Sequence, residues 1–258
     1  MSKITLAEPG VAMPPTQADL PYDDGIPMET QRHKAQMDLL IDALLPWLAG
    51  RQDGYVSGNM FVYFSLTQVR NQDFRGPDFF AVLGVPKGER KSWVVWEEGK
   101  APDVVIELLS DSTAELDKNQ KKLIYQNQLR VPEYFWFDPF NPDDWAGFSL
   151  DHGVYQPLAE NAQNQLVSQS LGLALVRWQG NYKDINATWL RWATMEGELL
   201  LTSQEIAQEE RIRADQRAEQ AESQLQYTVR NLLREGMSVE QVARLTGLSE
   251  PQVEQLGN

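Results

Sequence analysis

The sequence contains no cysteine and only two histidines among its 258 residues. The lack of cysteine excludes disulfide bonds, thiol nucleophiles and thiolate zinc sites, and two histidines are too few for a poly-histidine metal site. No apolar stretch approaches the length of a membrane span, and the N-terminus lacks the basic start and apolar run of a secretion signal. We therefore expect a cytoplasmic protein without a membrane partner, whose chemistry would depend on carboxylates and lysines.

Basic residues are also scarce, since 23 lysines and arginines face 37 aspartates and glutamates and leave a formal net charge of -14. This balance disfavours tight, unassisted binding to nucleic acid. The acidity is lighter between residues 87 and 130, where basic and acidic residues are equally frequent. The hydrophobic fraction of 42% is enough for a core and excludes a wholly disordered chain.

Three segments differ in composition. Residues 1–20 form a proline-containing arm that we expect to be irregular, residues 21–200 form the main domain, and residues 201–258 form a helical extension. Within the main domain, apolar residues at steps of three and four between Met37 and Leu48 predict an amphipathic helix. Short β-branched and aromatic runs predict strands at 60–64, 79–83, 93–96, 104–109, 134–137, 145–150, 153–158 and 173–178.

A helix from Ser112 or Thr113 to about Leu129 is predicted between the strands at 104–109 and 134–137. The order strand, helix, strand implies a crossover connection and therefore a parallel pair of strands. The strand at 104–109 is the most apolar of all, which is typical of a strand covered on both faces.

The extension begins with a polar stretch at 202–235 that lacks proline and glycine and predicts one long helix. Two short helices at 239–246 and 250–256 follow, with Ser238 and Ser249 as caps. The long helix favours a self-associating coiled coil or a spacer, so we expect a homo-oligomer formed through this tail. The short helices resemble a helix-turn-helix, but glutamates outnumber Arg244 there, which favours a packing or oligomerisation module over DNA reading.

Carboxylates stand out at the start of two predicted strands and within one of them. Asp78 and Asp103 each follow a proline and precede an apolar strand, and Glu107 lies within the second of these strands. A carboxylate among valine, isoleucine and leucine must be paired, hydrogen-bonded or bound to metal. Asp103 lies about 13 Å from Glu107 along the strand, so Asp78 is the better partner for it, and Asp103 has the alternative role of capping a turn.

The predicted helix after this strand supplies cations. Lys121 lies four residues before Tyr125, on the same helix face, whereas Lys118 and Lys122 have the alternative of a solvated face. Two carboxylates and a lysine suit metal-assisted phosphodiester hydrolysis, because carboxylates bind a hard divalent ion such as Mg²⁺ and a lysine offsets charge on the phosphate.

These motifs together resemble the Uma2 family, which belongs to the PD-(D/E)XK superfamily of restriction-endonuclease-like proteins. The resemblance spans about residues 20–200 and rests on the stretches 76–80, 102–113, 117–125, 131–134 and 138–139. It implies an α/β (α+β) fold, with a restriction-endonuclease-like mixed central β-sheet flanked by helices, to which the long C-terminal helix and the small helical extension are added.

The resemblance also implies roles for individual residues. Asp78 and Glu107 would hold the metal, Mg²⁺ or Mn²⁺, and Lys121 would complete the catalytic set. The superfamily's usual strand lysine is replaced here by Leu109, and Lys121 on the following helix is the matching position. Supporting candidates are Glu29, His33, Asn59 and Tyr125.

The sequence therefore indicates a divalent-metal-dependent endonuclease that hydrolyses phosphodiester bonds of nucleic acid, most naturally a Mg²⁺-dependent endodeoxyribonuclease acting on DNA. The alternative is a catalytically silent nuclease-fold module that binds protein or DNA. The missing strand lysine and the negative net charge favour this alternative, and the presence of both Asp78 and Glu107 disfavours it.

Overall fold

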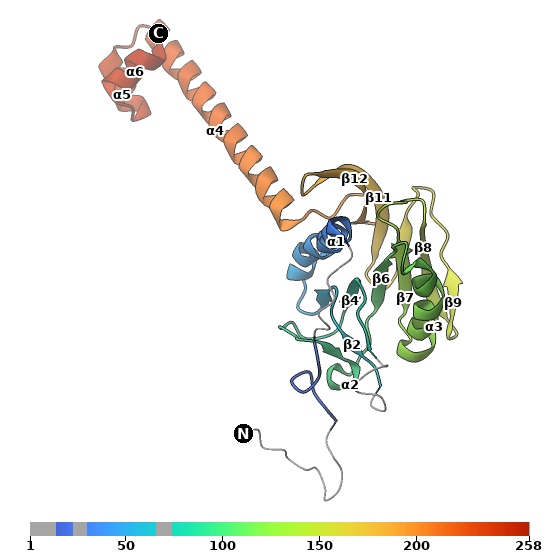
Figure 1. Cartoon of the computed structure of the whole chain (residues 1–258). Helices are drawn as coiled ribbons and strands as arrows, with labels where there is room; N and C mark the ends of the chain where they lie inside the picture. The colour runs from blue at the N-terminus through green and yellow to red at the C-terminus, as the bar shows by residue number, and fades with distance from the viewer. Residues whose placement is uncertain (1–13, 23–29, 66–73, 258) are drawn as a thin grey trace, which may run out of the picture. The chain divides into compact units, whose positions relative to one another are not determined.

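The computed structural model describes residues 14–22, 30–65 and 74–257, and the chain divides into two compact units, Met1–Ser203 and Gln204–Asn258 (Figure 1). The helical elements of the first unit are α1 (Gln31–Ala49), α2 (Val95–Glu98), η1 (Leu116–Lys121), α3 (Lys122–Ile124) and η2 (Tyr125–Leu129), where η marks π-helical turns. Its strands are β1 (Tyr55–Ser57), β2 (Val62–Tyr63), β3 (Phe74–Arg75), β4 (Phe79–Val82), β5 (Trp93–Val94), β6 (Val104–Leu108), β7 (Glu133–Phe137), β8 (Trp145–Asp151), β9 (Val154–Pro157), β10 (Leu166–Ser168), β11 (Leu173–Tyr182) and β12 (Ile185–Ala193).

A six-stranded mixed sheet forms the centre of this unit, in the order β1-β4-β6-β7-β8-β9. Strands β6 and β7 are parallel, and the other neighbouring pairs are antiparallel. Two three-stranded sheets, β10-β11-β12 and β3-β2-β5, accompany the central one. The predicted mixed sheet with flanking helices is thus confirmed, as is the parallel pair on either side of the η1–α3–η2 crossover.

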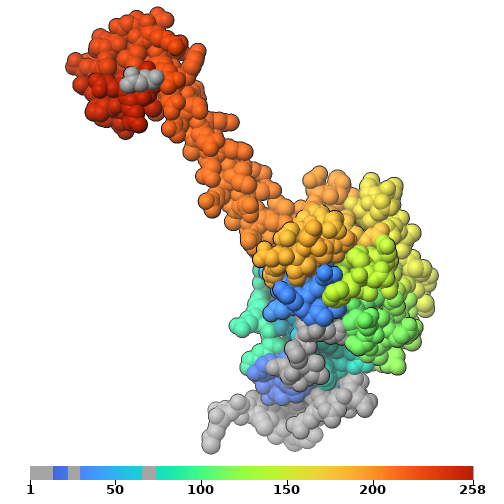
Figure 2. Space-filling view, turned by 45° about the horizontal axis from the view of Figure 1, so that its top comes forward, coloured from blue at the N-terminus to red at the C-terminus, as the bar shows by residue number. Residues whose placement is uncertain are grey.

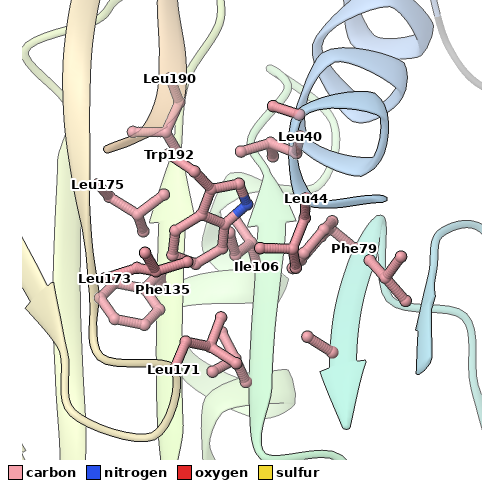
Figure 3. Close-up of a cluster of buried hydrophobic side chains, with 14 of the residues drawn as sticks. Leu40, Leu44, Phe79, Ile106, Phe135, Leu171, Leu173, Leu175, Leu190 and Trp192 are labelled. Atoms are coloured by element: carbon pink, nitrogen blue, oxygen red, sulfur yellow. The ribbon is translucent and has the colours of Figure 1, made fainter. Parts of the chain in front are cut away.

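Both faces of β6 are buried, as its apolar sequence predicts, because each face carries a separate cluster of side chains. Val104, Ile106 and Leu108 point into a cluster shared with α1 and the β10–β12 sheet. Figure 3 shows Trp192 reaching into this cluster beside Leu44 of α1. The opposite face carries a cluster formed mainly by these residues: Val62, Phe80, Trp93, Val105, Tyr125, Leu129, Tyr134, Phe148 and Tyr155.

The β11–β12 hairpin lies against α1, as Figure 2 shows. The amide of Gln36 makes two hydrogen bonds of 2.8 Å to the main chain of Leu190, one as donor and one as acceptor. At the hairpin tip, Lys183 pairs with Asp38 at 2.6 Å. These polar contacts fix the position of α1 on the core cluster.

Some local predictions differ from the structure. The run at 93–96 predicts one strand, but β5 ends at Val94 and α2 follows, because Glu97 and Glu98 continue a helical turn that Gly99 ends with φ 74°. The predicted helix up to Leu129 is present but is wound in π-helical turns on either side of α3. At its start, the Ser110 hydroxyl accepts a hydrogen bond from the main-chain N–H of Thr113.

The second unit contains most of α4 (Ser203–Arg234), followed by α5 (Val239–Thr246) and α6 (Glu250–Gly257). A small apolar cluster centred on the fully buried Val229, Val242 and Val253 holds the end of α4 against α5 and α6. Ser238 and Gln241 form a capping box at the start of α5. None of the helices in the described ranges combines the length and apolar character needed to cross a membrane.

Candidate active site

Antiparallel pairing of β4 with β6 brings the two predicted acidic residues together. Phe79 pairs with Ile106, so the next position outward places Asp78 beside Glu107. The carboxylate of Asp78 accepts a hydrogen bond of 2.7 Å from the main-chain N–H of Leu108, which fixes the side chain at the end of β6. The sequence prediction that Asp78 rather than Asp103 accompanies Glu107 agrees with this geometry.

A tight turn before β2 supports the chain at Asp78. Asn59 has φ 47°, in the left-handed region that asparagine tolerates, and its N–H donates to the carbonyl of Pro77 at 2.9 Å. At Gly58 an added Cβ would lie 2.2 Å from the carbonyl oxygen of Asp78, so only glycine allows this close approach. Asn59, a supporting candidate, thus shapes the main chain and offers no side-chain contact that the structure shows at the carboxylates.

The crossover helix places Lys121 and Tyr125 against Glu107, whose side chain is 0% exposed. The Tyr125 hydroxyl donates to Glu107 Oε1 at 2.7 Å, and the Lys121 Nζ lies 3.1 Å from Glu107 Oε2. Both oxygens of Glu107 are therefore engaged by groups from the helix. The Lys121 side chain remains 20% exposed and connects the buried cluster to solvent.

Asp117 is a third carboxylate at this site, and sequence reasoning did not include it among the candidate residues. Its Oδ1 lies 2.6 Å from the Lys121 Nζ, and the residue is 1% exposed. The Tyr134 hydroxyl donates to its main-chain carbonyl at 2.9 Å and holds η1 against β7. The available signal was the four-residue spacing of Asp117 and Lys121, which places an acid and a base on one helix face.

The electrostatics of the site follow from three acids sharing one lysine. Loss of water around the carboxylate, together with the negative charge of Glu107, raises the pKa of Asp78 well above its usual value, although the residue keeps some exposure. Burial and the Glu107 charge likewise raise the pKa of Asp117. Burial alone would lower the pKa of Lys121, but the charges of Glu107 and Asp117 outweigh it and raise this pKa. Full ionisation of the three acids would leave an excess of negative charge, which a bound cation would offset.

The donor set fits a hard divalent ion. Mg²⁺ usually takes one or two protein carboxylates and completes its shell with water and substrate phosphates, so Asp78 and Glu107 suffice as protein ligands. Within residues 14–22, 30–65 and 74–257, no group of three or more histidine, cysteine, aspartate or glutamate side chains is placed to hold one metal ion. The third carboxylate, Asp117, pairs with Lys121 at 2.6 Å.

Two of the remaining residues considered from the sequence lie elsewhere, and a third is not among the described residues. The ring of His33 contacts the Leu109 carbonyl at 2.9 Å and the Thr30 hydroxyl at 2.8 Å, so both ring nitrogens bond to protein atoms, which favours a structural role. Asp103 accepts from the N–H of Leu83 at 2.7 Å and pairs with Lys100 at 2.8 Å, which supports its alternative role at a turn. Glu29 lies outside the described residues.

Lys118 and Lys122 do not form the simple solvated face that the sequence favours. Lys118 pairs with Asp144 at 2.5 Å. The Lys122 Nζ lies 3.3 Å from the centroid of the Phe148 ring, and the reduced hydration lowers its pKa. Both lysines therefore attach the helix to β8 and the loop before it.

A separate cavity of about 410 Å³ lies at the carboxyl ends of β6 and β7. The described residues that line it are Thr30, His33, Ser110, Asp111, Ser112, Asp138 and Phe140. These do not include Asp78, Glu107 or Lys121, so the charged cluster, and not this cavity, is the candidate active site.

Comparisons with known proteins point to one family. A family model named Uma2 and described as a putative restriction endonuclease matches residues 11–181, more than half of the chain. Among solved structures, one similar chain is described as a putative nuclease belonging to DUF820 from Anabaena variabilis. It has 16% sequence identity and a TM-score of 0.41, and the match covers 62% of this chain and 86% of that one. No curated protein matches this chain.

Proposed function

Because the chain belongs to the Uma2 family of putative restriction endonucleases, we propose that it is a divalent-metal-dependent endonuclease that hydrolyses phosphodiester bonds of DNA. The observation that supports this proposal most directly is the convergence of Asp78, Glu107 and Lys121 at the end of β6. The two carboxylates come from different strands and the lysine from the crossover helix, so the fold assembles a set that no single element contains.

Charge favours a cation at this place. Three carboxylates and one ammonium group would leave two negative charges uncompensated in a site with little water, which is costly. One divalent cation would offset this charge. Asp78 and Glu107 would hold it, and when bound the ion would polarise the phosphate and lower the pKa of a water molecule.

The residues of the chain have separate tasks in this proposal. The Leu108 N–H and the turn at Gly58 hold Asp78 in place, and Tyr125 holds one oxygen of Glu107. Lys121 is the partly exposed cation of the cluster, so its ammonium group would contact the phosphate or orient the attacking water. Lys121 would thereby take the task that the superfamily gives to a lysine at the position of Leu109.

Plasmid cleavage tests the proposal. We expect the full chain to nick or linearise plasmid in Mg²⁺ or Mn²⁺, and we expect Asp78→Ala and Glu107→Ala to reduce the rate by at least about 100-fold, as for loss of a principal electrostatic group. Asp103→Ala is the matched control, because it removes the carboxylate of the other Pro-Asp pair, which bonds to Leu83 and Lys100. Equal inactivity of all four proteins, with no metal bound, would instead support a catalytically silent binding module.

We also propose that the C-terminal unit mediates self-association. Most side chains of α4 before Leu225 are exposed, whereas its end is covered by α5 and α6. A second copy of the chain is a natural partner for such a helix, although its sparse apolar residues make a strong zipper unsuitable.

A further inference from the structure

The ammonium group of Lys121 lies between two carboxylates. It is 2.6 Å from Asp117 Oδ1 and 3.1 Å from Glu107 Oε2. The proposed metal pair uses Glu107 but leaves Asp117 without a task. A carboxylate that is 1% exposed is costly to bury unless a partner compensates for its charge, and Lys121 is the basic residue that does so here.

A metal ion bound at Glu107 Oε2 would lie close to the Lys121 ammonium group, which is 3.1 Å from this oxygen, and the two cations would repel each other. The hydrogen bond from Tyr125 to Oε1 is fully buried, whereas the Lys121 side chain at Oε2 is 20% exposed. Lys121 is therefore the partner that can yield. If Lys121 moved away from Glu107 and had no other partner, the positive charge of its ammonium group would be left uncompensated in a largely buried site.

Asp117 is well placed to keep that group. Its main chain is fixed by the hydrogen bond from Tyr134 to its carbonyl, and it lies in the same π-helical turn as Lys121. We infer that Asp117 is a positioning residue, which retains the Lys121 ammonium group beside the site when a divalent cation takes the oxygen of Glu107 that faces Lys121. This inference rests on the proposed function.

The inference requires that Asp117 act through Lys121. In Asp117→Asn, Glu107 becomes the remaining carboxylate partner of Lys121, so the lysine competes more strongly with a cation for Glu107. In Lys121→Met no ammonium group competes with the metal ion for Glu107, so Asp117 can no longer affect metal binding through Lys121. A merely electrostatic role of Asp117 would instead weaken cation binding equally whether or not Lys121 is present.

Mn²⁺ titration of four full-length proteins tests this: wild type, Asp117→Asn, Lys121→Met and the double variant, followed calorimetrically. We expect Asp117→Asn to weaken Mn²⁺ binding about tenfold in the wild type and less than about threefold in the Lys121→Met background, a non-additivity typical of contacting residues. Asp144→Asn is the matched control, since it removes the carboxylate that pairs with Lys118 on the same helix at 2.5 Å, and it should leave the affinity unchanged.

Two different failures are distinguishable. Equal losses in both backgrounds would overturn the role of Asp117 while leaving the metal site intact. Absence of Mn²⁺ binding by the wild type would overturn the proposed function and the inference with it. Circular dichroism melting of each variant identifies any protein that fails to fold, and Lys121→Gln then replaces Lys121→Met in the cycle.

Discussion

Replacing Asp78 by asparagine should make the metal-free protein more stable while removing its response to metal. The amide oxygen of asparagine can still accept the hydrogen bond from the Leu108 N–H, so the main contact of the side chain is kept. The substitution removes one of the three carboxylates that share Lys121. Because poor hydration and the Glu107 charge oppose ionisation of Asp78, the loss of this charge should favour the folded state.

The size of the gain follows from the size of the domain. Removing an unfavourable charge from a functional site commonly stabilises a protein by about 0.5–2 kcal/mol. In a domain of about 150–250 residues, each kcal/mol changes the melting temperature by about 2–4 °C. In EDTA at pH 7 we therefore expect Asp78→Asn to melt about 1–8 °C above the wild type.

The pKa shift of Asp78 also predicts how the stabilisation by Asp78→Asn varies with pH. The pKa of Asp78 is higher in the folded state than in the unfolded state, so the folded protein keeps a proton that the unfolded chain has lost. The contribution of this group to stability is thus present below pH 3.8 and is lost as the pH rises through the folded-state pKa. The advantage of Asp78→Asn should grow over the same interval.

Metal should reduce or reverse the stability advantage of Asp78→Asn. At a metal concentration tenfold above its dissociation constant, binding stabilises the folded state by about 1.4 kcal/mol, or about 3–6 °C in the melting temperature. We expect this rise for the wild type in Mn²⁺ and no rise for Asp78→Asn, measured by differential scanning fluorimetry. A variant that is less stable than the wild type in EDTA, or that responds equally to Mn²⁺, would refute the reasoning.

Three further predictions concern the supports of the site and the tail. Tyr125→Phe removes the hydrogen bond to Glu107 and should lower the free energy of unfolding, measured in urea, by about 1.5–3 kcal/mol. The control Tyr155→Phe should cost less, because the hydroxyl of Tyr155 donates to a neutral main-chain carbonyl. Gly58→Ala should lower the free energy of unfolding by about 1–3 kcal/mol or more and weaken Mn²⁺ binding, because the added Cβ would lie 2.2 Å from the Asp78 carbonyl oxygen. In the control Gly88→Ala the added Cβ meets nothing within 4 Å, so stability and Mn²⁺ binding should not change. Deletion of residues 204–258 should lower the number of chains per particle, obtained by dividing the light-scattering mass by the mass of one chain, and should leave the melting of the first unit unchanged. An unchanged number of chains would rule out self-association through the tail.

Much of the site could be predicted because it depends on strand parity and on one crossover. Alternation along β6 places Glu107 on the face of Val105, and the strand–helix–strand order places the helix with Lys121 on that face. The spacing of Asp103 from Glu107 left Asp78 as the partner, and the register of β4 agrees. These are local rules, and they hold because β6 is regular and buried.

Asp117 could not be predicted in the same way, because its role depends on a tertiary contact. Its carboxylate reaches Lys121 in a π-helical turn, which no sequence pattern indicates, and its main chain depends on Tyr134 from β7. A solvent-exposed pair at this spacing would have the same sequence. Burial against β7 is what distinguishes the two.

Parts of the fold also depend on tertiary contacts and could not be predicted from the sequence. Strands of two or three residues, such as β3 and β10, exist because a neighbouring strand supplies their hydrogen bonds, and their own sequence carries little signal. The end of β5 at Val94 likewise follows from the left-handed turn at Gly99 and not from the apolar run. Trp192 of β12 lies in the core cluster against α1, beyond the last apolar run predicted as a strand, 173–178.

The acidic residues behind the net charge of -14 have different effects on the surface and in the buried cluster. On an exposed surface, as along much of α4, an excess of acid is solvated and mainly opposes contact with nucleic acid. At the end of β6 the excess has little water to stabilise it, so a divalent cation would be attracted there before any phosphate arrives. A cation so held would convert a repulsive acidic cluster into a binding site for the substrate, and Lys121, retained by Asp117, would add a second positive charge beside it. In the proposed function, this acidic chain would act on an acidic polymer at the end of β6, where Glu107 and the neighbouring Asp117 are buried together.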